Sequence, residues 1–119
     1  MQILLNTDTH VDGRQGMSDY LESVLTEALG NFGERITRVE AHVTDVDGAT
    51  KTRPGDIHCT LEARPGGHEP VVVKDRADTA HQAIHGASRK LERALSALFE
   101  KQDVRHGPRR ADSVDAIDP

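Results

Sequence analysis

Apolar residues recur every three or four positions in two parts of the chain, and this spacing predicts two amphipathic helices. The first stripe consists of Met17, Leu21, Val24, Leu25, Ala28, Leu29 and Phe32, with Ser18 near its start and Gly33 just past its end. The second stripe, in residues 78–101, consists of Ala80, Ile84, Ala87, Leu91, Leu95 and Leu98. Asp78 is the expected N-cap of this second helix, which at about 1.5 Å per residue is the longest predicted element.

Between the two helical stripes the apolar period changes to two, which is typical of strands with one buried face. The residues expected to face inward are Val39, Ala41, Val43, Ile57, Cys59, Leu61 and Ala63, whereas Arg38, Glu40, His42 and Thr44 face outward. The segments QILLN at residues 2–6 and PVVVK at residues 70–74 predict two further strands. RPGGH is expected to turn the chain between the last two strands, and residues 45–56 form a long polar connection.

These elements follow the order β-α-β-β-β-α, which predicts an α+β fold. Each helix has one apolar stripe, so burial is best achieved when both helices pack side by side on one face of a four-stranded sheet. Residues 103–119 lack apolar periodicity and are expected to form a disordered tail. Residues 1–102 are therefore expected to form a single domain.

Charge is distributed unevenly along the chain. The net charge is -5, and residues 1–50 alone hold three Arg or Lys against nine Asp or Glu. Residues 89–110 hold seven basic residues against three acidic ones. The whole molecule is therefore expected to repel nucleic acid, while a local basic patch late in the chain could still meet phosphate.

Length and composition exclude several classes of protein. A chain of 119 residues is too short for a barrel enzyme or a two-domain cleft. No apolar run approaches the roughly 20 residues of a membrane span, and the N-terminus lacks a signal peptide, so a cytoplasmic protein without membrane contact is expected. The only cysteine, Cys59, cannot form an internal disulfide and is expected to be a packed core residue.

Basic side chains on the second predicted helix are the strongest candidates for binding. Arg89 and Arg93 lie four residues apart and point away from the apolar stripe, with Lys90 at its flank. Arg35, Arg38, Lys51 and Arg53 could extend them into a discontinuous basic face for structured RNA. The plainer interpretation is that Arg89 and Arg93 pair with Glu92 and solvent.

Three patterns are similar to metal sites. Asp78, His81 and His85 follow helical spacing, but Gln82 replaces the general-base Glu of a zincin, so the histidines are better interpreted as lying at the margin of the buried stripe. Asp8, His10 and Asp12 alternate as in metallohydrolases, which use a far larger fold. Thr50 stands where a calcium loop starting at Asp45 needs glycine. We expect no metal, no cofactor and no enzymatic activity.

The last helix resembles that of the ribosome hibernation-promoting factor family, also called the sigma-54 modulation or ribosome-associated inhibitor family. The matching residues are Ala83, Ile84, Lys90, Leu91, Arg93 and Leu95. His85 and Ala94 replace the usual acid and Gln of the family pattern. Phe32, Arg35 and Ile36 are also similar to the family's aromatic and Arg-Ile before a strand. The resemblance covers residues 1 to about 102.

This resemblance implies a small protein that binds rRNA of the small ribosomal subunit, in the channel used by mRNA and tRNA, and silences or stores ribosomes under stress. Members of this length lack the extra C-terminal domain of longer ones. The family usually carries basic residues on both helices, whereas the first helix here presents Asp19, Glu22 and Glu27. The alternative hypothesis is therefore a protein-interaction module of the same fold that uses its acidic first helix against a basic partner.

Overall fold

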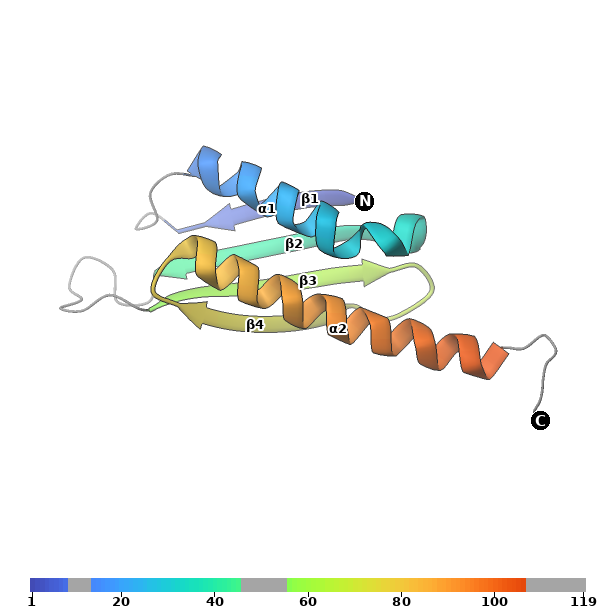
Figure 1. Cartoon of the computed structure of the whole chain (residues 1–119). Helices are drawn as coiled ribbons and strands as arrows, with labels where there is room; N and C mark the ends of the chain where they lie inside the picture. Colours follow the sequence, from blue (N-terminus) through green and yellow to red (C-terminus); the bar gives the residue numbers. More distant parts are fainter. Residues whose placement is uncertain (9–13, 46–55, 107–119) are drawn as a thin grey trace.

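The structure is a computed structural model that describes residues 1–8, 14–45 and 56–106. Its elements are β1 (Gln2–Thr7), α1 (Arg14–Leu29), a 3-10 helix η1 (Gly30–Arg35), β2 (Ile36–Asp45), β3 (Ile57–Pro65), β4 (Val71–Ala77) and α2 (Ala80–His106). The predicted order β-α-β-β-β-α and the α+β class are confirmed (Figure 1). None of the described helices is long and apolar enough to cross a membrane.

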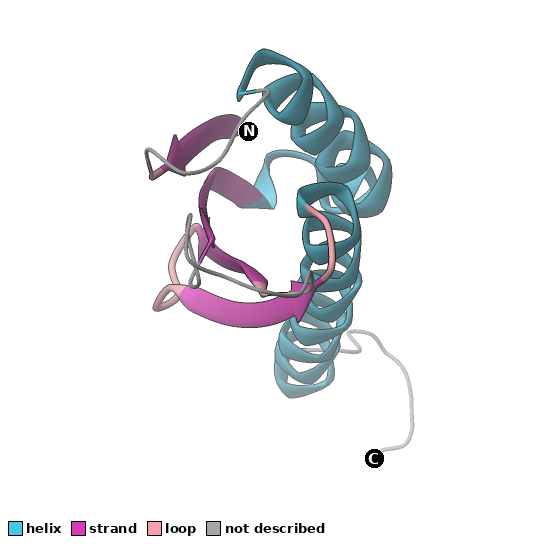
Figure 2. Cartoon of the chain, turned by 90° about the vertical axis from the view of Figure 1, so that its left-hand side faces the viewer, coloured by secondary structure: helices cyan, strands magenta, loops and turns pink. Residues whose placement is uncertain are grey.

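The four strands form one mixed sheet in the order β1-β2-β3-β4. β1 runs parallel to β2, and the other neighbours are antiparallel. Parallel neighbours need a long crossover connection, which α1 provides. Figure 2 shows the result as two layers, with both helices on one side of the sheet and the other side left open.

The core lies between these layers, because the inward faces of the strands meet the apolar stripes of the helices. Its fully buried large side chains include Leu21, Leu25 and Leu29 of α1, Ile36, Val39 and Val43 of β2, Cys59 and Leu61 of β3, and Ile84, Leu91 and Leu95 of α2. The predicted inward set of β2 and β3 is confirmed. Ala83, Ser88 and Phe99 are buried as well, although the predicted stripe of α2 left them out.

Both helices differ from the prediction at their ends. α1 begins at Arg14, three residues before the apolar stripe, and Phe32 lies in η1 rather than in α1. Asp78 was predicted as the N-cap of α2, and this is wrong. The cap is Thr79, whose side-chain oxygen accepts a hydrogen bond of 3.1 Å from the backbone N–H of Gln82.

α2 ends later than predicted, at His106, so it includes the first residues of the segment expected to be a tail. Residues 107–119 of that segment lie outside the described part of the chain. The boundary of the domain at residue 102 therefore stays a prediction.

A close approach between α2 and β4 fixes the position of the helix over the sheet edge. A side-chain carbon added at Gly86 would collide with the carboxylate of Asp75 on β4. The ammonium of Lys90 lies 3.3 Å from the same carboxylate and donates a 2.9 Å hydrogen bond to the backbone oxygen of Lys74. A larger residue at position 86 therefore requires the Asp75 side chain to turn away from the place where it contacts Lys90.

Candidate nucleic-acid interface

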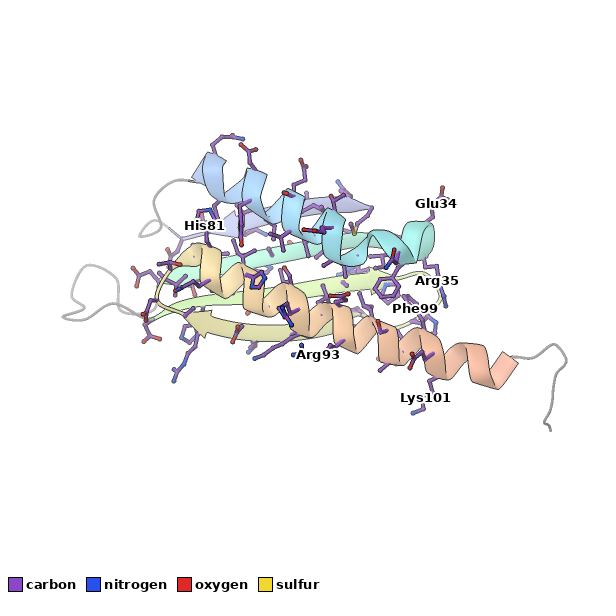
Figure 3. All side chains as sticks on the ribbon, in the orientation of Figure 1. Glu34, Arg35, His81, Arg93, Phe99 and Lys101 are labelled. Carbon is purple, nitrogen blue, oxygen red and sulfur yellow. The ribbon has the colours of Figure 1, made fainter. Side chains whose placement is uncertain are left out.

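Arg89 and Arg93 lie on the outer face of α2, which is directed away from the sheet. Both are exposed, and neither forms an ion pair with Glu92 or with any other described residue. Four residues correspond to about 6 Å along a helix, so the two guanidinium groups follow each other along one side. Figure 3 shows Arg93 midway along α2, with Lys101 further toward its end. We call Arg89, Arg93 and Lys101 the outer cations of α2.

Lys101 was not predicted as a binding residue. It is exposed and lies about two helical turns beyond Arg93. Two further steps of four residues lead from Arg93 through Ala97 to Lys101, and because each step turns by about 40°, Lys101 lies on the flank of the helix nearer to Lys90 than to Arg89.

Lys90 points to a different side of α2 from Arg89. Its ammonium contacts the carboxylate of Asp75 and the backbone oxygen of Lys74, both on β4. Its charge is therefore largely occupied inside the molecule, and its main role is to hold α2 against the edge of the sheet. A half-exposed pair of this kind contributes up to about 1 kcal/mol to stability.

Arg35 lies at the end of η1 and contacts α2. Its guanidinium carbon lies 3.8 Å from the centre of the Phe99 ring. The backbone oxygen of Arg35 accepts a 2.8 Å hydrogen bond from Gly66 in the turn between β3 and β4. Arg35 is exposed at the surface of the molecule while it contacts the ring.

Arg38 lies on the opposite side of the sheet from the outer cations of α2. It alternates with inward-facing Val39 on β2, and its cross-strand neighbours are Gln2 and Arg64. A single flat RNA surface therefore cannot contact Arg38 and Arg93 together. Lys51 and Arg53, the other two predicted RNA contacts, lie outside the described residues, as do His10, Asp12 and Thr50.

The open face of the sheet carries further cations that the sequence prediction left out. They are Arg64 on β3 and Lys74 and Arg76 on β4. Acidic groups lie among them: Arg64 is 3.6 Å from Glu62, and Arg76 is 3.9 Å from Asp56. The alternating sequence pattern of the strands indicates that these side chains face outward. Only the sheet register shows which of the charges are neighbours.

His81 and His85 of α2 are exposed on the helix. The ring of His81 makes an edge contact with Tyr20 of α1 at a centroid distance of 4.3 Å (Figure 3). Among the described residues, no group of three or more His, Cys, Asp or Glu side chains is arranged to hold a metal ion. Asp8, from the second proposed metal pattern, instead accepts a 3.3 Å hydrogen bond from the backbone of Asp45.

Cys59 is fully buried on the inward face of β3, as predicted. Its cross-strand neighbour is Asp75. Burial raises the pKa of the Cys59 thiol from 9.0 to about 12, and the negative charge of Asp75 adds to this effect. A thiol protonated at neutral pH and shielded from solvent is a core residue rather than a nucleophile.

A groove runs between α1 and α2 and has a volume of about 520 Å³. We call it the interhelical groove. It is lined by Tyr20, Ser23, Val24, Glu27 and Ala28 of α1 and by His85, Ser88, Arg89 and Glu92 of α2. Ser88 is 1% exposed, and its hydroxyl has no hydrogen-bond partner among the described residues. Such a group typically costs about 1–3 kcal/mol when it stays unsatisfied.

The fold and this surface define a class: a small two-layer α+β protein with a cationic outer helix and no described metal cluster. Residues 6–103 match the family described as Sigma 54 modulation protein / S30EA ribosomal protein. The match spans most of the chain, so this protein belongs to that family. The resemblance found in the sequence is thereby confirmed.

Solved structures that share the fold include the following two. The N-terminal domain of Protein Y from Thermus thermophilus is similar with a TM-score of 0.67 at 15% identity, covering 82% of this chain and 99% of that one. A ribosomal subunit interface protein from Coxiella burnetii has a TM-score of 0.60 at 14% identity, covering 84% of this chain and 99% of that one. No curated protein has a significant sequence match.

Proposed function

We propose that this protein is a non-enzymatic ribosome-associated factor that binds rRNA of the small subunit and modulates translation under stress. The observation that carries the proposal is the pair Arg89 and Arg93, exposed on the outer face of α2 without an ion pair to any described residue. Family membership and the subunit interface protein of similar fold support a ribosomal target. The cytoplasm is the expected place of action.

The chemistry of the outer cations suits a phosphate backbone. A guanidinium group presents several N–H donors in a plane and can bind two phosphate oxygens at once. Arg89 and Arg93 therefore supply two guanidinium groups along one side of a rigid helix, and Lys101 adds a third positive charge. Arg35 is a further contact at the end of the helical layer, whereas Lys90 contributes less because it already contacts Asp75.

The open face of the sheet is the competing RNA surface. It carries Arg38 and Arg64, but Glu40 and Glu62 lie directly opposite each other in the neighbouring row of the same strands. Carboxylates of Glu92 and Glu100 also lie beside Arg89 and Arg93 on α2. The faces differ because Arg64 and Arg76 form ion pairs with Glu62 and Asp56, whereas Arg89 and Arg93 form none with a described residue, so the outer face of α2 is the better candidate. Two double variants, one on the outer face of α2 and one on the open face of the sheet, distinguish the two surfaces. They are matched because each removes two guanidinium groups.

The test is co-sedimentation of the full chain with purified small ribosomal subunits across a salt series. We expect Arg89→Ala with Arg93→Ala to weaken binding about tenfold and to flatten the log-log salt slope by about 1.4 to 1.8, since each phosphate contact contributes about 0.7 to 0.9. Arg38→Ala with Arg64→Ala is expected to stay within about twofold of the parent.

Circular dichroism checks that both double variants remain folded. A loss confined to the Arg38 and Arg64 variant would move the RNA contact to the open face. Absence of co-sedimentation of the parent chain at low salt would refute ribosome binding itself.

A further inference from the structure

We propose that the α1 side of the helical layer is a second binding surface, which takes a lysine- or arginine-rich segment of a protein and has the interhelical groove at its centre. This inference goes beyond the RNA contact proposed above and does not depend on it. The two surfaces share the helical layer but have opposite charge.

The exposed face of α1 is acidic. A shallow hollow on it is lined by Asp19, Glu22, Ser23, Thr26 and Glu27. Asp19 accepts a hydrogen bond from Gln15, while Glu22 and Glu27 form no ion pair with any described residue. Carboxylates that are unpaired and close together attract a cationic partner and repel phosphate, so this face suits a basic protein rather than RNA.

The hollow continues into the interhelical groove, because Ser23 and Glu27 line both. The α1 wall of the groove includes the apolar side chains of Val24 and Ala28. Glu27 from α1 and Glu92 from α2 supply one carboxylate from each helix. A lysine or arginine side chain can lay its alkyl stem along this apolar wall and bring its charged end to the carboxylates.

Two other charged or titratable side chains of α2 line the same groove. Arg89 and His85 lie on the α2 side. The positive charge of Arg89 repels an incoming cation, which leaves the Glu27 side of the groove as its place. The proposed segment therefore runs along α1, with one basic side chain entering the groove next to Glu27.

Ser88 provides an independent reason to expect a ligand in the groove. Its hydroxyl is almost completely buried and has no hydrogen-bond partner in the described part of the chain. Native proteins rarely leave such a group unsatisfied. A hydroxyl can accept a hydrogen bond, so an ammonium or guanidinium N–H that widens the groove as it enters supplies the missing partner.

The experiment is a titration of the isotope-labelled full chain, followed by NMR, with a short synthetic peptide of alternating glycine and arginine. We expect the shifted signals to map to α1 and to the groove, including Ser23 and Ser88. Glu27→Gln is expected to weaken binding about fivefold to tenfold, as for the loss of one charge-assisted contact. Glu69→Gln, which removes one exposed carboxylate after the β3–β4 turn, is the matched control and should change little.

Ser88→Ala tests the groove separately from the charges. We expect it to weaken peptide binding about threefold while the thermal midpoint stays the same or rises, because the variant removes a buried unsatisfied hydroxyl. Unchanged peptide affinity in Ser88→Ala would refute the groove as the centre of the site.

Other outcomes overturn the proposal as a whole. Equal weakening by Glu27→Gln and Glu69→Gln would show attraction by overall charge only. Equal binding of a peptide with glutamine in place of arginine would remove the cation from the interaction. Equal binding of spermidine would indicate a polyamine site rather than a protein-binding surface.

Discussion

The guanidinium carbon of Arg35 lies 3.8 Å from the centre of the Phe99 ring, so a cation expected to meet RNA is also attached to the end of the core. Phe99 is 4% exposed, and its ring makes edge contacts with Phe32 at 5.2 Å and His68 at 6.1 Å between centroids. These contacts join α2, η1 and the β3–β4 turn at one end of the molecule (Figure 3).

Substitution of Phe99 should therefore affect stability far more than substitution of Arg35. We expect Phe99→Ala to lower the free energy of unfolding by about 3–5 kcal/mol, because it leaves a cavity between three elements. Arg35→Ala should cost about 1 kcal/mol, of which an exposed cation–π contact accounts for about 0.5–1 kcal/mol. Urea unfolding of both single variants and the double variant measures the coupling, and additive effects would show that the stacking contributes nothing.

Gly86→Ala should destabilise the protein even though alanine is the better helix former. The added carbon collides with the Asp75 carboxylate, so that side chain has to turn away and lose its contact with Lys90, and overpacking of this kind costs about 1–3 kcal/mol. Gly16→Ala in α1 is the control, because nothing lies within 4 Å of the added carbon. It should stabilise by up to about 1 kcal/mol. Thermal unfolding of the two variants compares their stabilities directly. Equal stabilisation by Gly86→Ala and Gly16→Ala would contradict the close approach of Gly86 to Asp75.

Cys59 should make stability fall at alkaline pH. The thiol pKa is raised from 9.0 to about 12 in the folded chain, so the unfolded chain loses this proton first as pH rises. The contribution is fully present below about pH 9 and is lost on approach to pH 12, at up to about 1.4 kcal/mol per pH unit. Unfolding by urea from pH 7 to pH 11 should show a steeper loss for the parent than for Cys59→Ala. If the stabilities of the parent and of Cys59→Ala fell in parallel with pH, the raised pKa of the Cys59 thiol would be ruled out.

The N-terminus of α2 should depend on Thr79 and not on Asp78. Thr79→Ala removes the hydrogen bond to the backbone of Gln82 and should cost about 1 kcal/mol. Asp78→Ala should change stability by no more than about 0.5 kcal/mol, since its exposed side chain does not cap the helix. Chemical unfolding measures both, and a larger loss for Asp78→Ala would restore the capping role predicted from the sequence.

The sequence by itself determined the order of the elements and the faces they bury. The helical period of residues 17–32 and the alternation of residues 57–63 depend only on the chain's local geometry, so they predicted which side chains enter the core. The pattern of Ala83, Ile84, Lys90 and Leu91 also led to the correct family.

The tertiary structure alone decided which charges act together. Arg38 and Arg93 are both exposed cations in the sequence pattern, yet the sheet separates them, because β2 turns Arg38 toward the open face. Lys90 meets Asp75, and Ser88 reaches the groove beside α1, only after α2 packs on β4 and α1. Such contacts join residues far apart along the chain, and local periodicity carries no information about register or packing between elements.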